Sequence, residues 1–439
     1  MTYDMFYRLQ KILLSLAILT PTSNIFSVPI TNDSIIVNQQ DAHWGAELEF
    51  QAGTVMILDK YQKSYMKSKD DYSFGLKLTH ASLPSDNDPY AYDYNYPTFS
   101  IVTKFSKNNG ATMHRDVDFP HWSYLTDEYY EISPYKTHLG NSLALYGSFS
   151  YPLLRNKRWE IDISGNIGLA YSATKYDKEK SVDNDMIGSH LLFYAGGGIS
   201  ATYRLSNSYG LRAGLDYWHI SDGSTRQPNR SANIIGPTIG FVYYPYYESL
   251  LDKTNIFCPS KFKPYWYMNI KGGVGMKTCF EDWERTQYNL KKDDPDWRTE
   301  RFRLYSVASL QTDMMYRYSR IGSIGGGIDL QYASCYSHIR DIDNSKGYPI
   351  NCGHSPWSFA LDLKHTLFYK NISLALGLGV YLYREMGDYS NRKELFFFNR
   401  IGVHYTIPKW YNITFGVEVK AHLANADFSE LIVSWPIKL

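Results

Sequence analysis

The stretch RWEIDISGNIGLAY, residues 158–171, alternates between two kinds of side chain. Its odd-numbered positions carry mainly large apolar groups, whereas its even-numbered positions carry charged, polar or small groups. Successive side chains of a β-strand point to opposite faces, so the stretch predicts a strand with one apolar and one polar face. The segments ISLALGLGVYL (372–382) and YNITFGVEVKAHL (411–423) repeat the pattern.

Segments of this kind recur along the whole chain. We place strand starts near residues 44, 72, 98, 142, 158, 190, 209, 233, 265, 302, 321, 357, 372, 394, 411 and 426. The segments run for about 10 to 14 residues, as a tilted strand that crosses a bilayer requires. Barrels of this kind have an even strand number, so we predict sixteen. Fourteen is the alternative if an early or the final segment is not a strand, and the final one has mixed alternation and contains Pro436.

The connections between these segments alternate in length. Short ones lie at 153–157, 205–208, 317–321, 369–371 and 408–410, and long ones at 107–140, 173–189, 222–232, 278–301 and 336–355. Two connections, 81–97 and 246–262, are long where a short turn is expected. Short periplasmic turns and long outer loops are typical of outer-membrane barrels. The sequence therefore predicts an all-β fold, an antiparallel transmembrane β-barrel of about 14–16 strands.

Composition agrees with this fold class. The chain has 40 Tyr, 21 Phe and 10 Trp, yet its mean hydropathy is negative. Aromatic girdles and a wet interior produce that combination, although a secreted array of β-sandwiches would also fit. With 45 Lys and Arg against 44 Asp and Glu, the charge balance argues against a nucleic-acid partner.

The N-terminus predicts export. Arg8 and Lys11 precede the short apolar run ILLSLAILT (12–20), which is typical of a signal peptide cleaved between Ser23 and Ser27. No later stretch is continuously apolar for the roughly 18 residues that a spanning helix needs. We therefore expect a signal peptide over residues 1–27 and a single outer-membrane β-barrel over residues 28–439.

Four cysteines, an even number, are compatible with disulfides in an exported protein. They are Cys258, Cys279, Cys335 and Cys352. The connectivity is not readable from the sequence, but Cys335 and Cys352 flank one loop, which favours that pair; free or differently paired thiols are the alternative.

A candidate catalytic pair lies at the end of the segment 211–221. His219 and Ser221 share the parity of the apolar side chains that precede them, so both are expected on the lipid-facing wall. Asn233 has the matching parity on the next segment. A histidine beside a serine hydroxyl is the arrangement for nucleophilic ester cleavage, because the imidazole can take the hydroxyl proton near neutral pH.

The segment HISDGSTRQPNRSAN (219–233) resembles the signature of the outer-membrane lipid A 3-O-deacylases, the acyloxyacyl hydrolase family. LGNSLALYGSF (139–149), YSRIGSIGGGIDLQY (318–332) and KAHLANADFSE (420–430) are also similar to that family. The resemblance implies a serine esterase that deacylates lipid A, with its site at the outer leaflet of a bacterial outer membrane. Its partners would be lipopolysaccharide and the surrounding outer-membrane lipids.

The resemblance also implies roles for single residues. Ser221 would be the nucleophile and His219 the general base, while Asn229, with support from Gly223, would help the oxyanion site. Two positions depart from the family pattern. Asp222 stands where the family has Asn, and its carboxylate could repel an oxyanion. Asn233 stands where a glutamate orients the histidine; an amide can hold the imidazole but cannot stabilise its cation by charge.

Other interpretations compete with this one. His422, Asp427 and Glu430 could form a second site, but their parity favours a polar network inside the barrel. The chain could also be a non-catalytic barrel, either a diffusion channel or a surface interaction protein. No metal-ligand spacing stands out, so the sequence predicts neither a metal nor a cofactor.

Overall fold

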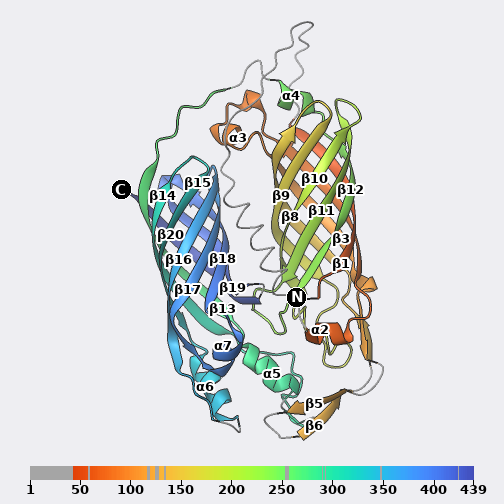
Figure 1. The fold of residues 1–439 in the computed structure, drawn as a ribbon, viewed down its shortest axis with the longest axis vertical. Coiled ribbons are helices and arrows are strands. Elements are labelled where there is room, and N and C mark those ends of the chain that lie inside the picture. Colours follow the sequence, from red (N-terminus) through yellow and green to blue (C-terminus); the bar gives the residue numbers. More distant parts are fainter. Residues whose placement is uncertain are drawn as a thin grey trace. The chain divides into compact units, whose positions relative to one another are not determined.

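The computed structural model describes residues 43–439, except 58–59, 116–118, 124–127, 133–134, 253–256, 289, 292, 347–348 and 424. The segment expected to be a signal peptide, residues 1–27, lies outside the described residues. Two closed antiparallel β-barrels account for most of the described chain (Figure 1). The all-β prediction is confirmed.

The first barrel is drawn from red to green in Figure 1. Its eight strands are β1 (Trp44–Val55), β2 (Asp70–Ala81), β3 (Thr98–Lys107), β8 (Ser142–Arg155), β9 (Trp159–Ser172), β10 (Leu191–Arg204), β11 (Tyr209–Ser221) and β12 (Ala232–Tyr243). Neighbours in the sheet follow chain order, and β1 pairs with β12 to close the ring.

The second barrel, drawn in teal to blue, is closed by the pairing of its first and last strands. Its strands are β13 (Tyr265–Lys277), β14 (Tyr305–Arg317), β15 (Gly322–Ala333), β16 (His354–Tyr369), β17 (Ile372–Met386), β18 (Phe397–Ile407), β19 (Ile413–His422) and β20 (Asn425–Lys438).

The remaining elements lie in the connections. Two small hairpin sheets pair β4 (Thr112–Arg115) with β7 (Tyr135–His138) and β5 (Phe119–Ser123) with β6 (Glu128–Ile132). The helices are α2 (Lys60–Tyr65), α3 (Pro89–Asp93), α4 (Tyr247–Leu251), α5 (Phe280–Tyr288), α6 (Tyr336–Asn344) and α7 (Gly387–Lys393), with short 3-10 turns η1 (Pro84–Asp86), η2 (Asn108–Gly110) and η3 (Pro408–Trp410). Among the described residues, no helix is long and apolar enough to span a membrane.

The expectation of a single barrel over residues 28–439 is wrong, because sixteen barrel strands form two rings of eight. Their starts agree with the predicted ones within about three residues, and the predicted count of sixteen is right for the sum of both rings. The long connection at 246–262, which broke the alternation of loop lengths, joins β12 to β13 between the rings. Alternation of side chains describes each strand separately, so it cannot say which two strands close a ring.

Each barrel is apolar outside and polar inside. On β1, the outward Leu48 and Phe50 are 47% and 42% exposed, whereas the inward Glu47 and Gln51 are almost completely buried. Arg212 on β11 forms ion pairs with Glu47 and with Asp162 inside the first barrel. An apolar outer wall around a paired polar interior is the arrangement that places a barrel in a lipid bilayer.

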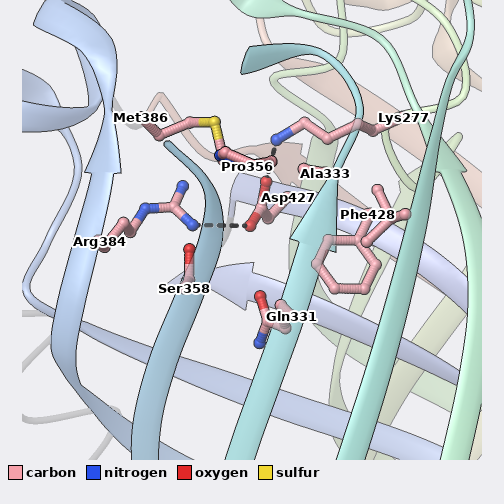
Figure 2. Close-up of a pocket in the computed structure, with 10 residues that line it drawn as sticks. Lys277, Gln331, Ala333, Pro356, Ser358, Arg384, Met386, Asp427 and Phe428 are labelled. Atoms are coloured by element: carbon pink, nitrogen blue, oxygen red, sulfur yellow. Dashed lines mark hydrogen bonds and ion pairs between the residues drawn. The ribbon is translucent and has the colours of Figure 1, made fainter. Parts of the chain in front are cut away.

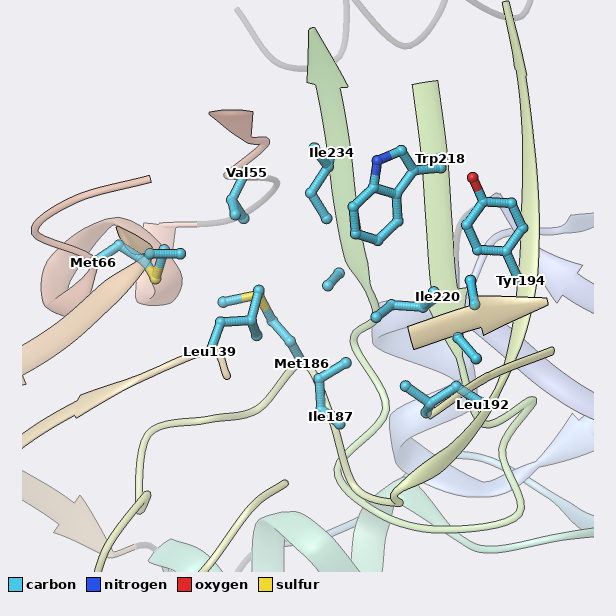
Figure 3. Packing of buried hydrophobic residues seen from close by; sticks show 14 of the residues in the cluster. Val55, Met66, Leu139, Met186, Ile187, Leu192, Tyr194, Trp218, Ile220 and Ile234 are labelled. Carbon is cyan, nitrogen blue, oxygen red and sulfur yellow. The ribbon is translucent and has the colours of Figure 1, made fainter. Parts of the chain in front are cut away.

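An apolar and aromatic cluster fills the first barrel at the end where the long loops emerge (Figure 3). Trp218 stacks at 5.9 Å from Tyr194, and the indole Nε1 donates a hydrogen bond of 3.0 Å to Gln51 Oε1. Ile220 and Ile234 lie in the same cluster. The side chains of even parity on β11 therefore point inward at this end, which leaves the odd-numbered side chains on the outer wall.

The cysteines do not follow the favoured pairing. All four are free thiols, and Cys335 shares a side-chain hydrogen bond with Cys279 rather than lying against Cys352. Cys279 follows β13 and Cys335 precedes α6, and both are buried in one apolar cluster. Strand pairing brings these distant positions together, and sequence separation alone did not indicate it.

We predict that the ion network inside the second barrel dominates its stability. Arg400 Nη2 lies 2.9 Å from Asp329 Oδ2, and the same guanidinium pairs with Glu430 and Glu418. Arg400→Ala leaves buried carboxylates without a cation and should lower the free energy of unfolding by about 3–5 kcal/mol. Urea unfolding in detergent measures this, with the exposed Arg340→Ala as control, for which about 0–1 kcal/mol is expected. Equal effects in both variants would contradict the prediction.

Candidate functional site

His219 lies on the outer wall of the first barrel, near the long-loop end of β11. Three residues of the same parity on this strand are 52% (Leu211), 48% (Leu215) and 46% (Tyr209) exposed. Across the strand pair, His219 lies directly opposite Asn233 of β12. As the sequence predicts, His219 and Asn233 therefore lie on the same outer face of the strand pair.

Asn233 holds the imidazole in one orientation. Its Oδ1 lies 2.9 Å from His219 Nδ1 and also accepts a 2.6 Å hydrogen bond from the Tyr217 hydroxyl. Its Nδ2 donates to Ser231 Oγ at 3.2 Å, which fixes which end of the amide faces the ring. An acceptor at Nδ1 favours the tautomer that is protonated there and leaves Nε2 as the basic nitrogen.

Tyr217 and Ser231 were not singled out from the sequence. Tyr217 has the parity of His219, so the alternation on β11 carried a signal for it. Ser231 lies in the loop with a positive φ of 62°, a conformation that no strand pattern predicts. Together with His219 they use both acceptor sites of Asn233 Oδ1 and one of the two N–H groups of Nδ2.

Ser221 ends β11, two residues beyond His219 on the same face. It is buried, at 7% exposure, and its register partner on β10 is Phe193. Among the described residues there is no hydrogen bond between His219 and Ser221. Positions i and i+2 of a strand lie roughly 7 Å apart, so a rotation of the two side chains can bring Nε2 to the hydroxyl.

The loop that follows Ser221 presents two hydrogen-bond donors. Asp222 N–H donates to Asn229 Oδ1 at 3.1 Å, so the Nδ2 group of this amide points away from that contact. Gly223 adopts a φ of +64°, which favours glycine. No described residue accepts a hydrogen bond from Asn229 Nδ2 or Gly223 N–H, so both donors are available to an outside acceptor.

The Asp222 side chain does not act on the imidazole. Its Oδ1 accepts from Arg226 N at 3.4 Å, and the carboxyl also accepts from the Ser224 and Thr225 amides, which closes the turn 222–226. Burial raises the pKa of Asp222 to about 8, against the lowering effect of those amides. At neutral pH the group is therefore largely protonated, and it adds little negative charge beside Ser221.

The same loop accepts hydrogen bonds from two residues of the second barrel's strands and connections. Thr278 N–H donates to Ser224 O at 2.8 Å, and the Thr278 hydroxyl donates to the same carbonyl at 3.0 Å. Ser429 Oγ donates to Gly223 O at 3.1 Å. These bonds hold the carbonyls of the turn, so its amide N–H groups keep a fixed direction.

The alternative site at His422, Asp427 and Glu430 is an internal ion network. Figure 2 shows a small pocket of the second barrel where Asp427 pairs with Lys277 and Arg384. His422 Nε2 is 3.0 Å from the Tyr381 hydroxyl, and Glu430 pairs with Arg400 instead. These charged groups neutralise one another, as the parity of the segment indicated.

Two closed barrels with apolar walls, one of which carries an ordered His–Asn pair at its rim, define an integral protein of the outer membrane. Residues 103–242 match the family model described as "Lipid A 3-O-deacylase (PagL)". Residues 265–439 match the model described as "Acyloxyacyl hydrolase, C-terminal domain". The matched region begins at the first residue of β13. The first barrel thus matches the lipid A 3-O-deacylase family, and the second barrel matches the C-terminal domain of the acyloxyacyl hydrolases.

Solved structures resemble the chain only weakly. The crystal structure of the outer membrane enzyme PagL shares 15% identity over 46% of this chain and 99% of its own, with a TM-score of 0.26. The toluene transporter TodX of P. putida shares 9% over 90% of each chain, with a TM-score of 0.18. TM-scores this low do not establish a shared arrangement. No curated protein matches the chain.

The raised pKa of Asp222 predicts how the stability of the protein changes with pH. Its pKa is raised in the fold, so the folded state holds a proton that the unfolded chain releases above about pH 4. The resulting loss of stability grows with rising pH and levels off above about pH 8. Asp222→Asn should remove this dependence and stabilise the protein more at pH 8 than at pH 4, as measured by urea unfolding in detergent.

The exposed Asp341→Asn serves as the matched control and should leave the pH profile unchanged. A profile for Asp222→Asn that runs parallel to the wild type would show that Asp222 is ionised in the fold.

Proposed function

We propose that this protein is an esterase that removes an acyl chain from lipid A, with Ser221 as nucleophile and His219 as general base. The observation that carries the proposal is the 2.9 Å contact between His219 Nδ1 and Asn233 Oδ1 on the outer side of the first barrel. It leaves Nε2 as the basic nitrogen, two residues from Ser221 on the same face of β11, which we place in the leaflet that holds lipopolysaccharide. The match of residues 103–242 to the lipid A 3-O-deacylase model supports the same substrate class.

The proposed reaction follows the order of other serine esterases. Ser221 Oγ attacks the ester carbonyl while His219 Nε2 takes the hydroxyl proton. The negative oxygen of the tetrahedral intermediate accepts hydrogen bonds from Asn229 Nδ2 and Gly223 N–H. The sugar alkoxide leaves with the proton from His219, and water then cleaves the acyl-enzyme by the same route.

Asn233 replaces a negative partner of the histidine with a neutral one. It fixes the tautomer by accepting from Nδ1, but it cannot stabilise the imidazolium by charge. The Tyr217 hydroxyl donates to the second acceptor site of the same oxygen, which weakens that oxygen as an acceptor for Nδ1. We therefore propose a working but slow enzyme, in which orientation rather than charge supports the base.

A diffusion channel is the weaker alternative. An eight-stranded barrel has an interior that side chains can fill, unlike the wide lumen of a sixteen-stranded one. In the first barrel Lys104 Nζ reaches Gln51 Oε1 at 2.6 Å, and Trp218 donates to the same oxygen. These contacts cross the interior and leave little room for a solute.

Loss of the nucleophile provides the first test. Cells that produce the wild-type chain should contain lipid A lacking one acyl chain, whereas Ser221→Ala should leave lipid A fully acylated. Mass spectrometry of extracted lipid A measures both. Ser208→Ala, in the turn before the opposite end of β11, is the matched control and should behave as the wild type. If cells that produce the folded wild-type protein have the same lipid A acylation as cells without it, the proposal is refuted.

The role of Asn233 provides the second test. Asn233→Ala removes the acceptor at His219 Nδ1 and should lower kcat by about 10²–10⁴-fold, because the ring loses its orientation. Asn233→Asp keeps the acceptor and adds a charge, so its kcat should equal or exceed that of the wild type. Release of fatty acid from purified lipopolysaccharide by each purified variant measures this. An Asn233→Ala variant as fast as the wild type would exclude the orienting role.

A further inference from the structure

A second cluster of reactive side chains lies in the loops of the second barrel, apart from the His219 site. Asp343 lies in the last turn of helix α6, and His354 begins strand β16, with Cys352 two residues before it. One ligand atom from each of the three residues lies within 4.8 Å of the other two. Cys352-Gly-His354 is a short ligand spacing, but the sequence alone does not reveal the group, because Asp343 is separated from these residues by a loop.

Neighbouring groups fix the three side chains. His354 Nε2 lies 2.7 Å from Asp343 Oδ2, and Asp388 N–H donates to the same oxygen at 2.8 Å. Gly387 N–H donates to Gly353 O at 3.1 Å, which holds the backbone between Cys352 and His354. Gly387 has a φ of +85°, a conformation that favours glycine, and a Cβ there would lie 2.7 Å from Asp343 Oδ2. The carboxylate is thus tightly surrounded.

The two carboxylate oxygens of Asp343 have different partners. Its Oδ1 pairs with Lys346 Nζ at 2.8 Å, and Lys346 pairs in turn with Asp388 Oδ2 at 2.8 Å. Its Oδ2 faces His354 instead. The lysine therefore neutralises one oxygen from outside the group, while the other oxygen, the imidazole and the thiol face one another. Such outer contacts to a ligating carboxylate are common around protein metal sites.

We propose that Asp343, Cys352 and His354 bind a borderline-soft divalent transition-metal ion of the Zn²⁺ class. Sulfur, imidazole nitrogen and carboxylate oxygen together are the donor set that Zn²⁺ takes, and Ca²⁺ and Mg²⁺ do not use sulfur. With metal bonds of about 2.0–2.3 Å, the donors of a tetrahedral site lie roughly 3.3–3.8 Å apart. The three atoms are within about 1 Å of that spacing, a distance that side-chain rotation covers.

Binding of the metal releases a proton. The Cys352 thiol loses a proton and forms a bond from sulfur to the metal, and His354 binds through a neutral ring nitrogen. The hydrogen bond between His354 and Asp343 opens as both become ligands. Three protein ligands leave a fourth position for water or an outside group. The site is independent of the proposed deacylation, because none of its residues belongs to the His219 group.

Cobalt titration of the refolded full chain in detergent tests this proposal. Co²⁺ bound to a thiolate gives a sulfur-to-metal charge-transfer band in the near ultraviolet, and tetrahedral Co²⁺ gives intense visible bands. We expect one equivalent of Co²⁺ to produce both, and Zn²⁺ to displace it. Cys352→Ser should abolish the charge-transfer band, and His354→Gln should weaken Zn²⁺ affinity by roughly tenfold or more.

Cys258→Ser is the matched control, since Cys258 is exposed and lies outside the group; it should bind as the wild type. Heat-dependent migration on a gel verifies that each variant is folded. As a second readout, Zn²⁺ should slow alkylation of Cys352 in the wild type but not in His354→Gln. A missing band in the folded wild type would overturn the proposal. So would a band that survives Cys352→Ser, because it would place the metal at Cys279 and Cys335.

Discussion

Closure of the two sheets is the constraint on which the rest of this structure depends. Lipid offers no hydrogen bonds, so every backbone amide and carbonyl in the membrane has to find a partner within the protein. The pairing of β1 with β12 and of β13 with β20 removes the free edges that open sheets would leave. Once each ring is closed, every side chain of a strand is committed either to the interior or to the lipid.

That commitment explains both the polar interiors and the position of the proposed site. Inside, charges such as Arg212 and Arg400 have carboxylate partners, because an unpaired charge there is costly. Outside, polar groups are tolerated only where they bind one another. Tyr217, His219 and Asn233 do so at the rim. A deacylase of membrane lipid benefits from this placement, since the ester reaches the wall without leaving the leaflet.

The loops supply backbone conformations and side-chain contacts that the regular strands do not provide. The loop after Ser221 has positive φ values at Gly223, Ser224 and Ser231, which the regular backbone of a strand does not allow. The protonated Asp222 carboxyl closes that turn, which explains how an acidic residue is accepted beside the proposed nucleophile. In the second barrel, the loops around α6 and α7 bring Asp343, Cys352 and His354 together. Both sites are rigid strand ends completed by a loop.

Alternation of side chains was enough to determine the strands, their starts, and the outward parity of His219 and Asn233, because strand geometry is local and has a period of two. The closure of sixteen strands into two rings was decided only in three dimensions, since pairing is a contact between distant segments. Only the tertiary structure also shows that Cys335 lies beside Cys279, that Tyr217 donates a hydrogen bond to Asn233, and that Asp343 lies close to Cys352 and His354. Each of these contacts depends on which segments lie side by side after the barrels close, and the alternation of side chains along the sequence does not contain that information.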